Sequence, residues 1–214
     1  MRTTLLPARP VHWGRQLAHL FLPLLVPGRH TREPWFLLSE KAVAPLRHPR
    51  VLTRATRCAV LYPYREPAVR ELLWACKFRH RPRALAPLLT DLSDLPLPPR
   101  VDAFVPLPLP RERERSRGFN QSALIAEALA RYTGGSVEAA LARTRNTPPQ
   151  SHLSKPERAA NVERAFAVVD PTLVAGRTLV LVDDIVTTGA TLAEARATLC
   201  AAGAREVWCV ALAG

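Results

Sequence analysis

Cysteine is scarce in this sequence. Its four cysteines, among 214 residues, include no pair with the two-residue separation that is typical of zinc ligands. No zinc site is therefore expected. We predict instead that all four are free, reduced core residues, as is usual for a cytosolic protein. They are Cys58, Cys76, Cys200 and Cys209.

Long apolar runs are also absent. A helix that crosses a bilayer needs about 20 apolar residues, and the apolar stretch at residues 17–27 is shorter and contains Pro23. No small-residue cleavage site follows this stretch, which argues against a secretory signal peptide. We therefore expect a cytoplasmic protein without a membrane span.

Lysine is rare as well, although the protein is strongly basic. Its only lysines are Lys41, Lys77 and Lys155, so nearly all of the positive charge behind the formal net charge of +12 comes from arginine. Arginine stays charged and binds phosphate through two parallel hydrogen bonds. This composition favours polyanionic partners such as nucleotides, pyrophosphate or nucleic acid. The alternative is an arginine-rich composition that only provides a solvated basic surface.

The most informative stretch present is residues 179–191, which read LVLVDDIVTTGAT. Four apolar residues suit a strand that is buried on both faces of a parallel sheet. Asp183 and Asp184 then lie at the carboxyl end of that strand, where open α/β sheets bind ligands. The small and hydroxylated residues that follow can direct their backbone N–H groups at one anion, at the N-terminus of a helix. They are Thr187, Thr188, Gly189, Ala190 and Thr191.

Two acids beside an anion-binding turn predict a sugar-phosphate ligand. Paired carboxylates suit the cis-hydroxyls of a ribose, or a Mg²⁺ ion shared with phosphate oxygens. The turn at residues 187–191 then holds the 5′-phosphate. The alternative is structural: a buried strand followed by an ordinary capped helix, with Asp183 and Asp184 simply solvated.

Alternating strands and helices predict a parallel α/β sheet, flanked by helices, with right-handed crossovers. Strands are expected at residues 58–62, 101–105, 165–169, 179–182 and 206–212, with a weaker one at 137–141. Helices are expected from Pro67, from Pro82, over residues 122–132 and after residue 191. Residues 1–55 are expected to form a small helical or irregular appendage, and residues 56–214 the main domain.

Two basic segments are expected near the acids. Residues 111–121 follow a predicted strand as a loop, in which Phe119 is exposed and Asn120 caps the next helix. Residues 143–161 are polar and interrupted by proline, which is typical of a mobile lid that closes over a pyrophosphate. The alternatives are a self-paired Arg/Glu surface for the first segment and a connection without a role for the second.

Several motifs follow one another in a characteristic order. They lie at residues 77–79 (KFR), 105–109 (VPLPL), 117–121 (RGFNQ), 143–145 (RTR) and 182–191 (VDDIVTTGAT). In this order they resemble the ComF family of competence-associated, type I phosphoribosyltransferase-like proteins, over residues 56–214. Family members usually open with a four-cysteine zinc element, whereas residues 1–57 contain no cysteine. The metal site of the family is therefore not carried over to this chain.

The resemblance implies a protein that binds 5-phosphoribosyl 1-pyrophosphate (PRPP) with Mg²⁺. Asp183 and Asp184 would be catalytic and hold the ribose and the Mg²⁺, and residues 187–191 would take the 5′-phosphate. The residues implied to contact pyrophosphate are Arg117, Asn120, Gln121, Arg145, Gln150, Lys155 and Arg158.

The resemblance also implies a role in DNA uptake and natural transformation, on the cytosolic side of the membrane. Single-stranded DNA and the DNA-uptake machinery are the candidate partners. Two alternatives stay open: a nucleobase phosphoribosyltransferase in salvage, and a non-enzymatic adaptor for single-stranded DNA or for the uptake machinery. Whether the protein turns over a substrate is left open as well.

Overall fold

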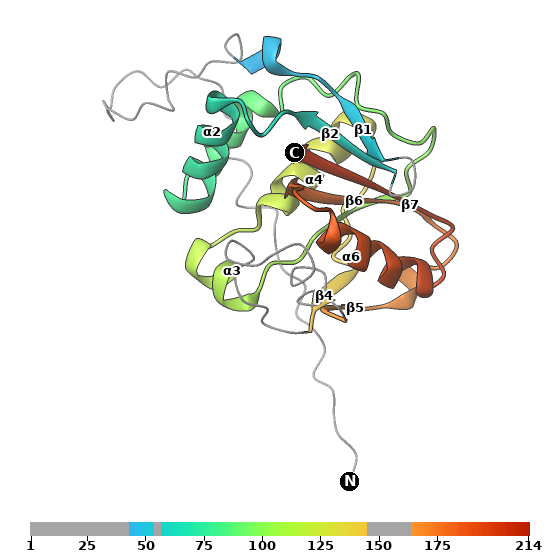
Figure 1. Cartoon of the computed structure of the whole chain (residues 1–214). Coiled ribbons are helices and arrows are strands. Elements are labelled where there is room, and N and C mark those ends of the chain that lie inside the picture. The colour runs from blue at the N-terminus through green and yellow to red at the C-terminus, as the bar shows by residue number, and fades with distance from the viewer. Residues whose placement is uncertain (1–42, 54–56, 145–163) are drawn as a thin grey trace. The chain divides into compact units, whose positions relative to one another are not determined.

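A five-stranded sheet forms the centre of the described part of the chain (Figure 1). The computed structural model describes residues 43–53, 57–144 and 164–214, all of which belong to one unit that spans residues 32–214. Most of the appendage expected over residues 1–55, and most of the lid expected at residues 143–161, lie outside the described residues.

The sheet has the strand order β1-β2-β7-β6-β3. β1 is antiparallel to β2, and the other four strands are parallel to one another. The bounds are β1 Arg50–Thr53, β2 Cys58–Tyr62, β3 Ala103–Pro106, β6 Thr178–Ile185 and β7 Glu206–Ala213. The predicted parallel α/β sheet is confirmed, and β1 adds an antiparallel edge strand that the sequence patterns did not indicate.

Helices pack on the sheet and begin where the sequence has a proline or a capping residue. α2 (Pro67–Phe78) has proline in its first turn. Asn120 accepts a hydrogen bond from the backbone N–H of Ser122 at the start of α4 (Gln121–Thr133), and α4 packs on β3 and β6. α6 (Ala190–Ala201) packs on β6 and β7. These three helices lie where the sequence predicted them.

Short 3₁₀ helices complete the helical part. They span Ala44–Leu46, Pro82–Leu88 and Pro171–Leu173. The second corrects the sequence analysis, which predicted an α-helix from Pro82. Pro87 lies inside this segment, and because proline has no backbone N–H it cannot extend an α-helical hydrogen-bond ladder.

The basic segment before α4 is a helix rather than the expected loop. α3 spans Arg111–Arg117 and ends at Gly118, whose φ of 77° lies in the left-handed region that favours glycine. Arginine and glutamate are both good helix formers, which explains the correction. Phe119 is buried, not exposed. It directly precedes the cap of α4, at the position where an apolar side chain commonly packs against the helix.

The strands predicted at 137–141 and 165–169 lead to a second, smaller sheet. β4 (Leu141–Arg143) pairs antiparallel with β5 (Phe166–Val168), outside the main sheet. Val137 makes only an isolated bridge to Phe104 of β3. The predicted strands at 137–141 and 165–169 are therefore misplaced in the sheet, because periodicity within a strand carries no information on its partner.

All four cysteines are free, and three are buried as expected. Cys58 and Cys209 are paired residues of β2 and β7. Cys200 is exposed, which corrects the prediction of a core residue. It follows the buried Leu199 on α6, and each helical residue is rotated by about 100° from the one before it, so Cys200 turns toward solvent.

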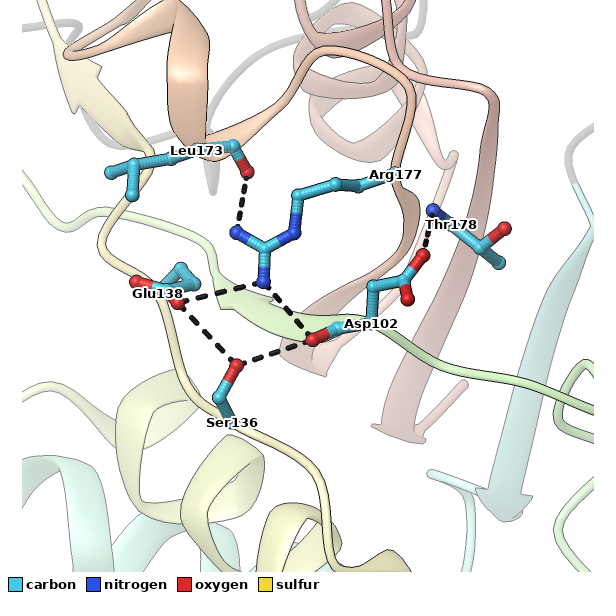
Figure 2. A network of polar contacts seen from close by, with 6 residues as sticks. All are labelled: Asp102, Ser136, Glu138, Leu173, Arg177 and Thr178. Carbon is cyan, nitrogen blue, oxygen red and sulfur yellow. Dashed lines mark hydrogen bonds and ion pairs between the residues drawn. The ribbon is translucent and has the colours of Figure 1, made fainter.

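Arg177 connects the amino-terminal ends of β3 and β6, at the edge opposite to the predicted site (Figure 2). Its guanidinium donates to the carbonyl oxygens of Leu173 at 3.0 Å and Asp102 at 3.1 Å, and lies 3.5 Å from Glu138. The Asp102 carboxylate accepts from the backbone N–H of Thr178 at 2.8 Å, the main reason why the pKa of Asp102 is lowered. The network fixes β3 against β6.

Replacing Arg177 should therefore destabilise the fold. Arg177→Met removes charge-assisted hydrogen bonds to two carbonyl groups, and we expect the free energy of unfolding to fall by about 1–3 kcal/mol in urea denaturation. The matched control is Arg100→Met, because Arg100 also contacts Asp102, through the side-chain carboxylate, but its side chain is 82% exposed. The control should change stability by less than about 1 kcal/mol. Equal losses in the two variants would contradict the role given to Arg177.

Candidate functional site

Asp183 and Asp184 belong to β6 itself, which continues to Ile185. Because side chains alternate along a strand, the two acids point to opposite faces of the sheet. Leu179 and Leu181 pack in one apolar cluster with residues of α6. Asp183 continues this series on the α6 face, and Asp184 lies on the face of α2. The two acids therefore have different partners.

Asp184 is buried and forms an ion pair with Lys77 of α2. The Lys77 Nζ atom is 2.7 Å from Asp184 Oδ2, and both side chains are largely buried. Burial lowers the pKa of Arg117 at the end of α3, while the charge of Asp184 raises it. The thiol of Cys76 has its pKa raised to about 12 by burial and by Asp184. Lys77 is therefore the direct partner of Asp184, and Arg117 interacts with Asp184 electrostatically, next to an inert thiol.

Asp183 is held by uncharged donors. Its Oδ1 accepts from the Ser122 hydroxyl at 3.2 Å and from the backbone N–H of Asp184 at 2.8 Å. Burial, and then the neighbouring Asp184 charge, raise the pKa of Asp183 to about 7, against the opposing effects of Lys77 and the two hydrogen bonds. A carboxyl group with such a pKa can accept or donate a proton near neutral pH.

A further arginine lies on the Asp183 side. Burial, and then the charge of Arg113, lower the pKa of Arg143, and the charge of Asp183 opposes this shift. The Arg143 guanidinium lies 5.4 Å from the centre of the Phe166 ring. This contact holds the cation of β4 against β5, and the charges of Arg143 and Asp183 attract each other.

The small-residue turn follows directly after β6. Thr187 and Thr188 are exposed, and Gly189 has a φ of 77° and precedes the first residue of α6, Ala190. Glycine adopts this left-handed conformation without strain. The turn therefore delivers the N-terminus of a twelve-residue helix, with its positive dipole end, to the same edge as the two acids. Thr191 lies in the first turn of that helix.

The polar side chains of the RGFNQ motif have two roles. Asn120 donates to the Leu107 carbonyl at 2.9 Å and accepts from the Ser122 N–H at 2.9 Å, so both ends of its amide hold the fold. Arg117 Nη1 donates to Gln121 Oε1 at 2.6 Å. Gln121 is 1% exposed, and its Nε2 has no hydrogen-bond partner among the described residues. Arg117 and Gln121 form one polar unit on the Asp184 side.

The remaining candidates fall outside the described residues, and their roles stay predictions. They are Arg145, Gln150, Lys155 and Arg158. Conversely, the sequence analysis did not select Lys77, Ser122 or Arg143 as site residues. Lys77 and Arg143 stand in motifs that resemble the ComF family, and Ser122 directly follows another. Their place in or next to these motifs was the only sign of a role that the sequence offered. Their relation to Asp183 and Asp184 is seen only in the fold.

The two carboxylates fit a Mg²⁺ ion that arrives with a phosphorylated ligand. Mg²⁺ is usually bound through one or two carboxylates together with substrate phosphates and water. Within residues 43–53, 57–144 and 164–214, no three His, Cys, Asp or Glu side chains converge as a metal site. Asp183 and Asp184 alone could therefore supply part of the coordination, and the ligand would supply the rest.

Comparison with known proteins agrees with this geometry. Residues 120–214 match the phosphoribosyl transferase domain family. DNA utilization protein YhgH of Salmonella typhi is 40% identical over 121 residues, which is 55% of this chain and 51% of the relative. Competence protein F of Haemophilus influenzae is 34% identical over 108 residues, 50% of this chain and 47% of the relative. Over about half of its length, the chain is therefore similar to ComF-like proteins with a phosphoribosyl transferase domain.

The chain spans about half the length of the curated relatives that it matches. The matched domain begins at Asn120 and contains α4, the two acids and the turn before α6. Lys77 and Arg117 lie before it. In the part of the chain that the structure describes, no helix is both long and apolar enough to cross a membrane.

Removing Lys77 should destabilise the fold. Lys77→Met leaves the buried Asp184 carboxylate without its closest cation, and we expect a loss of about 3 kcal/mol in the free energy of unfolding. Adding Asp184→Asn removes the uncompensated charge and should restore much of that loss. Arg65→Met is the control, because Arg65 is exposed and its contact to Glu66 is 3.9 Å long. If the double variant were no more stable than Lys77→Met, the ion pair would not be the cause.

The raised pKa of Asp183 predicts a pH dependence of stability. Between its ordinary pKa and about 7, the folded protein binds more protons than the unfolded chain, so this group makes the protein less stable as the pH rises through that window. Asp183→Asn keeps an oxygen acceptor for Ser122 and abolishes the titration. It should therefore stabilise the protein at pH 8 by at least about 1 kcal/mol more than at pH 5. Denaturant unfolding without Mg²⁺ tests this, with the exposed Glu112→Gln as a control that shows no such difference.

Proposed function

We propose that this chain is a PRPP-binding, phosphoribosyltransferase-like competence protein that acts in DNA uptake. The observation that supports this most is the edge of the sheet at which β6 ends. There, Asp183 and Asp184 are followed at once by a turn and by the N-terminus of α6. The edge lies within the matched phosphoribosyl transferase domain. A ribose with a 5′-phosphate needs these two features side by side.

In this proposal the 5′-phosphate of PRPP binds at residues 187–191. The N-terminus of α6 favours an anion through the positive end of its dipole. Gly189 carries no side chain to block the approach. The ribose hydroxyls donate hydrogen bonds to Asp183 and Asp184, and these carboxylates would hold a Mg²⁺ ion that neutralises negative charge on the ligand.

The cations beside the acids suit the pyrophosphate group of the ligand. Arg117 and Lys77 lie on the Asp184 side, and Arg143 lies on the Asp183 side. If the protein transfers the ribosyl group, negative charge grows on the pyrophosphate as its bond to the ribose breaks. Arginine and lysine that are already in place stabilise that charge in the transition state. Arg145, Lys155 and Arg158 are proposed to add to them.

The role in DNA uptake comes from the relatives. Their names are DNA utilization protein and Competence protein F, and this chain is similar to them over about half their length. A nucleobase phosphoribosyltransferase in salvage would use the same PRPP site and would also need a pocket that selects its acceptor base. The competence role is therefore the function we propose, in the cytoplasm and in contact with incoming DNA.

Isothermal titration calorimetry with PRPP and Mg²⁺ tests the site. The wild-type protein should release heat on binding, and Asp183→Ala/Asp184→Ala should bind at least about tenfold more weakly because two ligands of the ribose and the metal are lost. Asp170→Asn is the matched control, because Asp170 caps the 3₁₀ helix before β6 and lies away from the acids. Its affinity should equal that of the wild type.

Absence of heat in the wild-type protein would refute PRPP binding. Release of pyrophosphate from PRPP on addition of one free nucleobase would show turnover and would favour the salvage alternative. The proposed competence function expects PRPP binding whether or not any nucleobase acts as an acceptor.

A further inference from the structure

One face of α2 presents two large aromatic side chains to solvent. Trp74 and Phe78 are four residues apart and therefore lie on the same face of the helix. Trp74 is 45% exposed and Phe78 is 61% exposed. Their ring centroids are 5.7 Å apart, with the ring planes inclined by 41°. Adjacent exposed aromatic rings cost solvation free energy unless a partner covers them, so they indicate an interaction surface.

Positive charge surrounds these rings. The Arg79 guanidinium lies 4.8 Å from the centre of the Trp74 ring, and Arg70 is exposed one turn before Trp74. The only acid of α2 is Glu71, which is already paired with Arg79 at 3.4 Å. The α2 surface, defined here by Arg70, Trp74, Phe78 and Arg79, is therefore both aromatic and basic.

We propose that the α2 surface binds single-stranded nucleic acid. Bases stack on Trp74 and Phe78, and Arg70 and Arg79 pair with the backbone phosphates. Aromatic side chains stack on any unpaired base, and neighbouring cations neutralise the phosphates without regard to sequence. A duplex cannot use such a platform, because its bases are already stacked inside. The basic surroundings favour a polyanion over an apolar protein partner.

The same helix connects this surface with the candidate ribose-phosphate site. Lys77 lies between the two aromatic residues in the chain, but its side chain turns inward to Asp184. A strand bound on the outer face of α2 therefore passes beside the acidic edge of the sheet. The proposal gives a physical basis to the DNA-handling part of the proposed function, and it does not require PRPP to bind.

Fluorescence anisotropy with labelled oligo-dT tests this proposal. Trp74→Ala/Phe78→Ala should weaken binding by at least about tenfold, since each stacked base contributes to the affinity. Tyr132→Ala is the control, because Tyr132 is 55% exposed on α4 and lies outside the α2 surface. It should bind as the wild type does. Arg70→Gln/Arg79→Gln should reduce the slope of log affinity against log salt by about 0.7 for each phosphate contact that is lost.

Any of three binding results would overturn the proposal: a wild-type protein that binds no oligo-dT, an aromatic variant that binds it unchanged, or a duplex that binds as tightly as the single strand. A fall in melting temperature as large as that of the core variant Leu72→Ala would also overturn it, because the rings would then pack within the chain. PRPP calorimetry on the aromatic variant keeps the two proposals apart. Unchanged PRPP binding together with lost DNA binding supports the α2 surface. A failure of PRPP binding in the wild type refutes the proposed ribose-phosphate site alone.

Discussion

The burial of β6 on both faces determines where this strand can carry charged side chains. β6 lies between β7 and β3, and its residues from Thr178 to Val182 are buried. The strand can therefore carry acids only at its carboxyl end. Two unit charges about 4 Å apart interact by about 4 kcal/mol at the effective dielectric of a protein near its surface. The placement of Lys77 against Asp184 follows from this constraint, and so does the protonation of Asp183.

Because Asp183 and Asp184 are adjacent in one strand, their side chains point to opposite faces of the sheet and have different surroundings. Asp184 faces the α2 side and has Lys77 as its closest partner, whereas Asp183 accepts from a hydroxyl and a backbone N–H. One carboxylate is compensated by a cation, and the other has a raised pKa. A ligand at this edge therefore meets an ion-paired carboxylate on one face of the sheet and a carboxyl group with a raised pKa on the other. A sugar hydroxyl can donate to either group, whereas a metal ion would need the deprotonated form of Asp183.

Much of this arrangement could be predicted from the sequence, for a physical reason. Buried strands and capped helices depend on local patterns, so β6, α4 and α6 lie where the patterns placed them. The acids and the turn after them are contiguous in the chain and were found together. The partners of the acids could not be found in this way, because Lys77 and Ser122 reach them only through tertiary packing. The Arg/Glu segment at 111–117 shows the opposite failure, since charge pattern suggested a loop where helix propensity produced α3.

The choice of lysine at residue 77 is informative in so arginine-rich a chain. A guanidinium presents a broad planar fork, whereas an ammonium group is a compact point charge. Lys77 of α2 and Asp184 of β6 meet where both side chains are largely buried. A compact ammonium group fits there, whereas a guanidinium would leave some of its N–H groups without acceptors. The rotation of α2 about its own axis is set by its buried face, which includes Leu72, Leu73 and Cys76. Trp74 and Phe78 lie on the opposite side of the helix and are exposed. The exposed aromatic face therefore follows from the apolar packing of α2, and Lys77 reaches Asp184 from a position between the two faces.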